Sequence, residues 1–321
     1  MIRPAPVALG LLLIVCSAVL LVGCGEGPED ADRPVSGPRV LVLGTAQDGG
    51  LPHVACRCDR CEAARRDPAS RRRVSSLLLE TVDPPRRYLI DATPDLPEQL
   101  ASLTARIEEA RVDRRPLDGI FLTHAHIGHY LGLAYLGFEA MHAPGIPVHC
   151  TPRFASFLES NGPWEQLVRL ENIRLMPMDD ERVLEGGLRI RAIPAPHRDE
   201  YTDTVAFLIE GPTSRVLFAP DTDDWVNWEP PIESWLADVD VAILDGTFYS
   251  YDELPGRDVG SVGHPLISES IDRFSAMKGQ RGEIYFTHFN HSNPVLQNGP
   301  ALERLRKAGF HRLEDGSQFP L

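Results

Sequence analysis

The feature that most constrains the fold of this chain is a short apolar segment that ends directly before a histidine or an aspartate. The pattern occurs four times, before His124, His197, Asp221 and His288. Runs of this kind, such as Ile-Phe-Leu-Thr at residues 120–123, are typical of buried strands. Polar side chains at the ends of several strands often meet at one edge of a sheet. We therefore predict that these four residues share one site.

The composition is that of a soluble globular protein, with 43% hydrophobic and 24% charged residues in a chain of 321. It excludes a disordered chain, a collagen-like repeat and a multi-span membrane protein. Lys and Arg number 32 against 46 Asp and Glu, for a net charge of −14, so no nucleic-acid partner is expected. A small anionic substrate stays open, because a metal or a few arginines supply positive charge locally.

Hydrophobic periodicity predicts an α/β body that begins near residue 39. The predicted strands are residues 39–43, 74–81, 88–90, 119–122, 147–149, 188–193, 204–209, 216–218, 239–244 and 283–286. The predicted helices are residues 96–109, 152–158, 265–277 and 300–308.

The strongest signal for chemistry is the run Thr-His-Ala-His-Ile-Gly-His at residues 123–129. Its three imidazoles, on His124, His126 and His129, are good ligands for zinc and for iron. The alternative is a surface histidine cluster that binds nothing. Ligand-type residues recur after strands at His197, Asp221 and His288, which favours one or two metal ions.

A second signal is the cysteine loop, Cys56-Arg-Cys58-Asp-Arg-Cys61. Three thiolates in six residues have the spacing of metal ligands, and a fourth ligand from elsewhere would complete a tetrahedral structural zinc site. The alternative is a disulfide with one spare thiol, which an oxidising compartment permits.

At these residues the chain resembles the metallo-β-lactamase superfamily, whose hallmark is His-x-His-x-Asp-His followed by separate His, Asp and His ligands. The resemblance covers residues 39–321 and implies a single catalytic domain with a four-layer αββα sandwich. It implies that the first metal is held by His124, His126 and His197, and that Asp221 bridges to a second metal on His129 and His288. Asp91 would support the histidine loop from beneath without binding metal.

The chain departs from the family pattern at Gly128, where the superfamily has an aspartate. The second metal would then lack a carboxylate and bind weakly. Asp48, in the loop after the first strand, is a candidate for an additional ligand. The alternative is that Asp48 caps the turn beside Gly49 and Gly50.

The cysteine loop resembles two branches of the superfamily, the cyclic-phosphate phosphodiesterase of phosphonate breakdown and the coenzyme PQQ synthesis protein B group. In the former, a histidine three residues after the last metal ligand completes the zinc site. This position is His291 here, with His53 as the second choice. The stretches at residues 91–95, 244–248 and 263–265 resemble the PQQ group, which is associated with metal-dependent oxidation of a tyrosine.

Asp245 and His264 form a further candidate pair, similar to a Glu and His that related phosphodiesterases use together. A carboxylate bonded to the imidazole would orient it to donate a proton to a leaving oxygen. Pro265 predicts the start of a helix, which would place His264 at a helix N-terminus. The alternative is an ordinary helix cap.

The resemblance and the residues together predict a metal-dependent hydrolase, in which a metal-bound hydroxide attacks a phosphodiester or a related ester. Asp221 would orient or deprotonate the bound water, and His264 would assist the leaving group. The expected cofactors are one or two zinc ions in the histidine site and one structural zinc, with iron or manganese as alternatives in the histidine site. Oxidation chemistry like that of the PQQ group, and a non-catalytic metal- or ligand-binding lipoprotein, stay open.

The first residues are typical of a targeting segment. Arg3 precedes an apolar stretch at residues 7–22, which ends in Leu-Val-Gly before Cys24 and resembles a bacterial lipobox. We expect a signal peptide at residues 1–23, then the lipidated Cys24 and a flexible tether at residues 24–38. The expected location is the bacterial cell envelope, on the outer membrane or the periplasmic face. An uncleaved anchor and simple secretion are the alternatives.

Overall fold

The computed structural model describes residue 1 and residues 37–104, 114–254, 256, 258 and 261–321. Within them the backbone forms two seven-stranded sheets. The first has the order β14 (Gln318–Pro320), β1 (Arg39–Gly44), β2 (Ser76–Val82), β3 (Pro85–Ile90), β4 (Gly119–Phe121), β5 (Ile146–Cys150), β6 (Ile173–Pro177). The second has the order β13 (His311–Arg312), β12 (Glu283–Thr287), β11 (Val241–Asp245), β10 (Arg215–Ala219), β9 (Val205–Glu210), β8 (Arg189–Pro194), β7 (Glu181–Val183).

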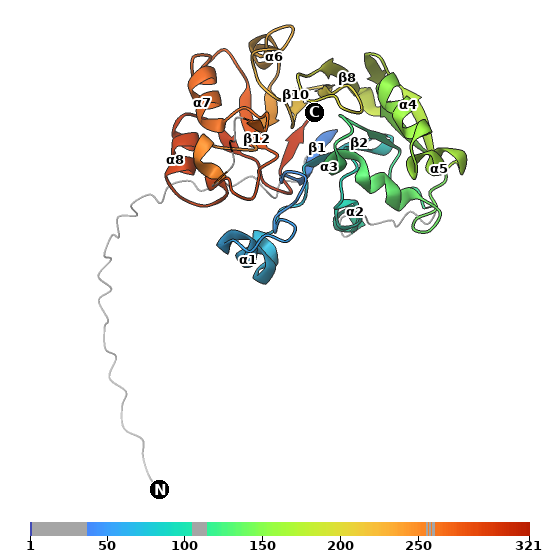
Figure 1. Ribbon diagram of the computed structural model, residues 1–321, viewed down its shortest axis with the longest axis horizontal. Coiled ribbons are helices and arrows are strands. Elements are labelled where there is room, and N and C mark those ends of the chain that lie inside the picture. Colours follow the sequence, from blue (N-terminus) through green and yellow to red (C-terminus); the bar gives the residue numbers. More distant parts are fainter. Residues whose placement is uncertain (2–36, 105–113, 255, 257, 259–260) are drawn as a thin grey trace. The chain divides into compact units, whose positions relative to one another are not determined.

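Helices cover the outer faces of the two sheets (Figure 1). Beside the first sheet lie α2 (Leu96–Thr104), α3 (Ile127–Tyr130), α4 (Pro152–Ser160) and α5 (Trp164–Arg169). Beside the second lie α6 (Ile232–Asp238), α7 (Ile267–Ser275) and α8 (Pro300–Lys307), while α1 (Asp59–Arg66) belongs to the cysteine loop. Short 3-10 turns occur at Pro68–Ser70, Leu131–Leu136, Glu185–Gly187, Tyr251–Glu253 and Pro294–Leu296.

Successive side chains of a strand point to opposite faces of its sheet, and this alternation builds the layers of the fold. In β1, Val40 and Val42 pack between the sheets against residues such as Phe218 of β10. The intervening Leu41 and Leu43 pack outward with Leu96 and other helix residues. Each fully buried side chain of this size contributes about 1.5–3 kcal/mol. Because both faces of the central strands are buried, their sequences read as continuous apolar runs. The predicted αββα sandwich is confirmed.

The predicted strands all form, with ends shifted by a few residues, and three of the four predicted helices do too. The fourth, at residues 96–109, forms as far as Thr104, and residues 105–113 lie outside the described part. The helix predicted from Pro265 begins only at Ile267, because Leu266 pairs with Phe248 in a β-bridge and keeps the preceding backbone extended. His264 is therefore not at a helix N-terminus, and that prediction was wrong.

The predicted signal peptide, Cys24 and residues 25–36 of the tether lie outside the described residues. Among the helices that the structure describes, none is long and apolar enough to cross a membrane.

Candidate metal centre

The strand ends bring the predicted ligands together. His124 follows β4, His197 follows β8, and Asp221 follows β10. Together with His126, these residues form a group whose ligand atoms lie within 4.8 Å of one another. The donor set proposed for the first metal is thus assembled by three separate loops, one after a strand of the first sheet and two after strands of the second.

Asp221 lies at the centre of the imidazoles. Its Oδ2 is 3.3 Å from the Nε2 atoms of His124 and His197, 3.6 Å from that of His129 and 3.8 Å from that of His288. Burial opposes a charge on Asp221, but the neighbouring His197 and His288 hold the pKa of its carboxyl well below its usual range. A charged carboxylate between two sets of imidazoles suits a bridging ligand.

A second group consists of Asp48, His129 and His288. Asp48 Oδ1 lies 3.5 Å from His129 Nε2 and 3.7 Å from His288 Nε2. The loop after β1 thus brings the candidate ligand Asp48 beside His129 and His288, so this group contains a carboxylate although Gly128 supplies none. Asp48 Oδ1 makes no hydrogen bond within the described residues, which speaks against the turn-capping alternative.

Each histidine is oriented through the ring nitrogen that faces away from the centre. The partners are Asp91 for His129 (2.8 Å), Asp223 for His197 (2.8 Å), Thr247 for His288 (2.8 Å), Thr123 for His124 (3.0 Å) and Glu200 for His126 (3.2 Å). Partners of this kind fix the tautomer and ring orientation of metal-binding histidines. Asp91 also accepts hydrogen bonds from the backbone and hydroxyl of Thr123, so its predicted supporting position is confirmed.

Buried polar atoms without partners test whether a metal fits. The Nε2 atoms of His124, His129 and His288 and the Oδ1 atoms of Asp48 and Asp221 are buried and make no hydrogen bond. Buried polar atoms almost always have a hydrogen-bond partner. Five buried ligand atoms without one, in neighbouring groups, are what metal-binding residues show when their free atoms face a metal position. Burial and the nearby charge of His129 hold the pKa of His124 well below its usual range, which keeps it in the neutral form that binds metal.

His264 and Asp245 adjoin this centre. His264 Nδ1 lies 2.9 Å from Asp245 Oδ2 and 3.4 Å from Asp221 Oδ1. Asp245 is fully buried and also accepts hydrogen bonds from the backbone N–H groups of Thr222 and Thr247. Burial alone would lower the pKa of His264, but the charges of Asp245 and Asp221 raise it to about 9. The pair therefore presents an imidazole of fixed orientation beside the metal ligands.

A pocket of about 380 Å³ adjoins His264. Asp223, Trp225 and Tyr251 contribute to its walls. Trp225 is otherwise buried and donates its indole N–H to Ser270, so it both packs the core and lines the pocket.

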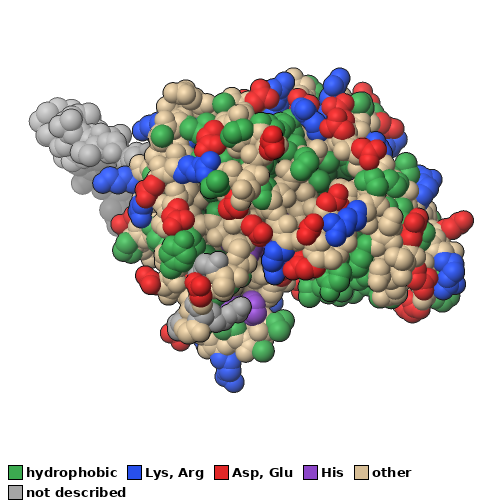
Figure 2. All heavy atoms as spheres, turned by 45° about the horizontal axis from the view of Figure 1, so that its top comes forward, with side chains coloured by type: hydrophobic (Ala, Val, Ile, Leu, Met, Phe, Trp, Pro, Cys, Tyr) green, Lys and Arg blue, Asp and Glu red, His purple; other side chains and the backbone are tan. Residues whose placement is uncertain are grey.

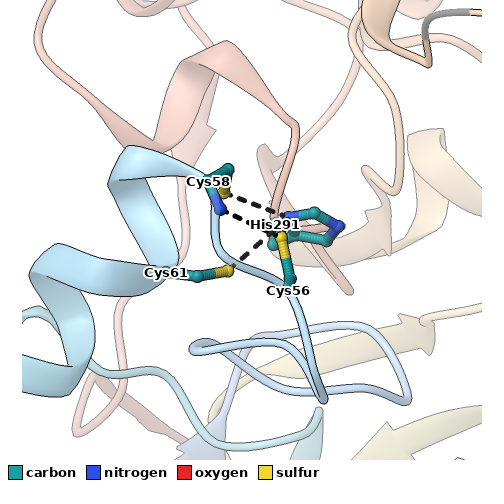
Figure 3. A group of neighbouring side chains, drawn as sticks. All are labelled: Cys56, Cys58, Cys61 and His291. Carbon is teal, nitrogen blue, oxygen red and sulfur yellow. Dashed lines mark hydrogen bonds between the residues drawn. The ribbon is translucent and has the colours of Figure 1, made fainter.

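The cysteine loop forms a separate centre with His291 (Figure 3). The three Sγ atoms each lie 3.6 Å from His291 Nδ1. Tetrahedral zinc with Zn–S of about 2.3 Å and Zn–N of about 2.0–2.1 Å separates sulfur from nitrogen by about 3.6 Å. Within the described residues every cysteine is free, so the disulfide alternative is not realised.

His53 is not the fourth ligand of the cysteine loop. Its ring packs 4.6 Å from the ring of His291, and its Nδ1 lies 3.0 Å from the carbonyl of Val54. Its backbone N–H donates to Cys61 Sγ at 3.3 Å, and that of Cys58 donates to Cys56 Sγ. His53 therefore supports the thiolates from outside the ligand set.

The metal ligands of the histidine centre are largely hidden from solvent. His129 and His288 have no exposed surface, and His124 is 1% exposed. On the face drawn in Figure 2, acidic and basic side chains are interspersed and little histidine surface is visible. The histidines of this centre thus lie inside the fold rather than on its surface.

Sequence reasoning missed Asp223, Glu200 and Thr247. Asp223 lies two residues after Asp221, and Thr247 lies two residues after Asp245, so proximity to predicted residues was the available signal. Glu200 lies on an exposed loop three residues after His197, so a similar signal was available there.

Comparisons with known proteins agree with this geometry. A family profile described as "Beta-lactamase superfamily domain" matches residues 86–289. Coenzyme PQQ synthesis protein B of Rhizobium meliloti is 27% identical over 307 residues, which cover 88% of this chain and 98% of that protein. Zn(2+)-bound PqqB from Methylobacterium extorquens superposes with a TM-score of 0.73 at 21% identity, covering 88% of this chain and all of that one. A diphosphatase from the PhnP family superposes with a TM-score of 0.60 at 20% identity, covering 88% and 97%.

These two structural similarities concern the fold alone. The family match includes β3 to β12 and every residue of the histidine centre except Asp48, and it leaves out the cysteine loop and His291. It spans more than half of the chain. The chain therefore belongs to the metallo-β-lactamase superfamily.

Proposed function

We propose that this chain is a metal-dependent hydrolase that cleaves a phosphodiester or a related ester. The observation that carries the proposal is the His264–Asp245 pair, which lies 3.4 Å from the central carboxylate of the metal ligands. A metal site alone suits storage or redox chemistry as well. An imidazole that a buried carboxylate orients beside the metal suits a reaction in which a leaving oxygen needs a proton.

Zinc bound to these donors would lower the pKa of a water ligand to about 7 and so supply a nucleophile at neutral pH. Asp221 Oδ1 makes no hydrogen bond and can orient a water. Asp245 holds His264 through Nδ1, so Nε2 is the ring atom left to protonate the leaving group. The pocket beside His264 would receive that leaving group.

Local charge supports an anionic substrate despite the acidic balance of the whole chain. The carboxylates in the three overlapping donor groups of the histidine centre are those of Asp48, Asp221 and Asp245. Two divalent ions would present positive charge at their open coordination positions, which attracts phosphate oxygens, while Asp91 and Asp223 lie on the far side of the histidine rings.

The test is hydrolysis by the zinc-loaded chain, with His264→Asn as the diagnostic variant. On a phosphodiester with a poor alkoxide leaving group, His264→Asn should reduce kcat about 10²-fold or more, the usual contribution of a general acid. On a 4-nitrophenyl ester the loss should be much smaller, because 4-nitrophenolate leaves without a proton. Metal content should not change.

The matched control is His142→Asn, an exposed histidine outside the centre that should leave both rates unchanged. Equal losses on good and poor leaving groups would remove His264 from the proton-donating role. No hydrolysis of any ester by a fully metal-loaded chain would overturn the hydrolase proposal.

A second candidate is metal-dependent oxidation in PQQ synthesis. It is favoured by relatives named coenzyme PQQ synthesis protein B, which this chain matches over 98% or more of their length. This function predicts iron in the histidine centre and oxygen consumption during turnover. The hydrolase proposal predicts turnover with redox-inert zinc and no oxygen consumption, so an oxygen electrode separates the two. Metal binding without any turnover would favour a non-catalytic binder.

We also propose that Cys24 anchors the chain to the cell envelope. The support is the sequence Leu-Val-Gly-Cys at residues 21–24, which follows an apolar stretch. Cys24→Ala should abolish lipid labelling, and persistent labelling of that variant would refute the anchor.

A further inference from the structure

We infer that Asp48 is the carboxylate ligand of the second metal and that Gly128 is the residue that makes room for it. The two positions compete for one volume, so the carboxylate can be supplied from 48 or from 128 but not from both. The inference deepens the proposed function, because it completes the metal centre on which that function rests.

The position of Asp48 is that of a ligand. Its Oδ1 lies 3.5 Å from His129 Nε2 and 3.7 Å from His288 Nε2, and all three atoms are buried without a hydrogen bond. The other oxygen, Oδ2, accepts a hydrogen bond of 3.1 Å from the side chain of Gln47. One oxygen is thus oriented by the protein, and the other is free to coordinate a metal.

Gly128 shows why this arrangement excludes a side chain on the histidine motif. A Cβ atom on Gly128 would lie 1.9 Å from Asp48 Oδ1 and 2.5 Å from its Cγ. Contacts below 3.0 Å require something to move. Gly128 is the second residue of α3, and its lack of a side chain gives space to the carboxylate of Asp48.

The backbone holds Asp48 beside His288. The N–H of Gln47 donates to the carbonyl of Phe289 at 3.0 Å, and the N–H of Phe289 donates to the carbonyl of Thr45 at 2.9 Å. Ala46 and Phe289 also form a parallel β-bridge. Because the residues next to Asp48 and His288 are paired, the two side chains keep a fixed relation, as a metal centre needs.

The test is a carboxylate swap in the full chain, followed by cobalt(II) titration monitored by absorption and by metal counting. Asp48→Gly should weaken binding of the second equivalent at the histidine centre about 10²-fold or more and leave the first nearly unchanged. Gly128→Asp alone should also weaken it, because the new side chain collides with Asp48. The double variant, Asp48→Gly with Gly128→Asp, should recover most of the lost affinity.

Asp48→Asn controls for misfolding, because it keeps the shape of the side chain and removes only its charge. It should weaken binding of the second equivalent as Asp48→Gly does. Asp83→Asn, in an exposed turn, is the control that should change nothing. Unchanged binding in Asp48→Asn, or a double variant no better than the worse single variant, would overturn the inference. Since binding is the readout, these results stand whether or not the chain hydrolyses esters.

Discussion

Replacing Asp221 with alanine should remove metal from both parts of the histidine centre and reduce turnover by roughly 10³-fold or more. The reason is its position, with Oδ2 within 3.8 Å of the Nε2 atoms of four histidines. Metal ions contribute several kcal/mol to catalysis, and each 1.36 kcal/mol is tenfold in rate. Elemental analysis of the purified variant, together with its rate on the best ester, measures both effects.

The control is Asp272→Ala, which removes an exposed carboxylate paired with Arg304. Exposed pairs contribute little to stability, so metal content and rate should match those of the parent chain. If Asp221→Ala kept two metals in the histidine centre, Asp221 would not be the shared ligand and the assignment of both donor sets would have to change.

The second large effect is expected from Cys56, Cys58 and Cys61, changed together to serine. The variant should lose one zinc per chain, because the three thiols surround His291 Nδ1 at 3.6 Å each. Zinc contributes folding free energy at such sites, about 10–16 kcal/mol in small peptides. Even a fraction of that should lower the melting temperature by roughly 10 °C in a chain of this size.

The same variant should weaken the second metal of the histidine centre. His291 follows His288 by three residues, and the cysteine loop continues from the segment that carries Asp48. Loss of the zinc therefore loosens two ligands of the other centre. Cys150→Ala, at a buried thiol outside the loop, is the control for losing a cysteine. Unchanged zinc content in the triple variant would favour a disulfide after all.

The two buried sheets could be predicted from the sequence because each central strand is marked by its own run of apolar residues. Apolar runs such as residues 39–43 and 216–218 are buried on both faces, so they are recognisable without knowing their neighbours. Strands such as β7 (Glu181–Val183) and β13 (His311–Arg312) were missed, since they are short, polar and held by backbone pairing to a neighbouring strand. Their place depends on the fold as a whole.

The candidate site also has a part that could be predicted from the sequence and a part that could not. Residues that follow strands were predicted, because strand ends meet at a sheet edge. The residues that orient them come from distant loops: Asp223, Glu200 and Thr247 contact histidines 26, 74 and 41 positions away in the sequence. Pairs of this kind have no spacing pattern, so tertiary structure is needed to find them.

Gly128 is the most instructive residue for sequence reasoning. Considered alone, it indicates a lost ligand and a weak second metal. In the structure, its missing side chain is matched by Asp48, whose carboxylate fills the space that a Cβ would occupy. A departure from a motif therefore has to be judged with the residues that can reach the same volume.

The most direct test of the whole account is anomalous diffraction at the zinc edge on crystals of the zinc-loaded chain. The account predicts three peaks: one among His124, His126, His197 and Asp221, one among Asp48, His129, His288 and Asp221, and one among the three cysteines and His291. A single peak in the histidine centre with Asp48 turned away from it, or no peak at the cysteine loop, would contradict it.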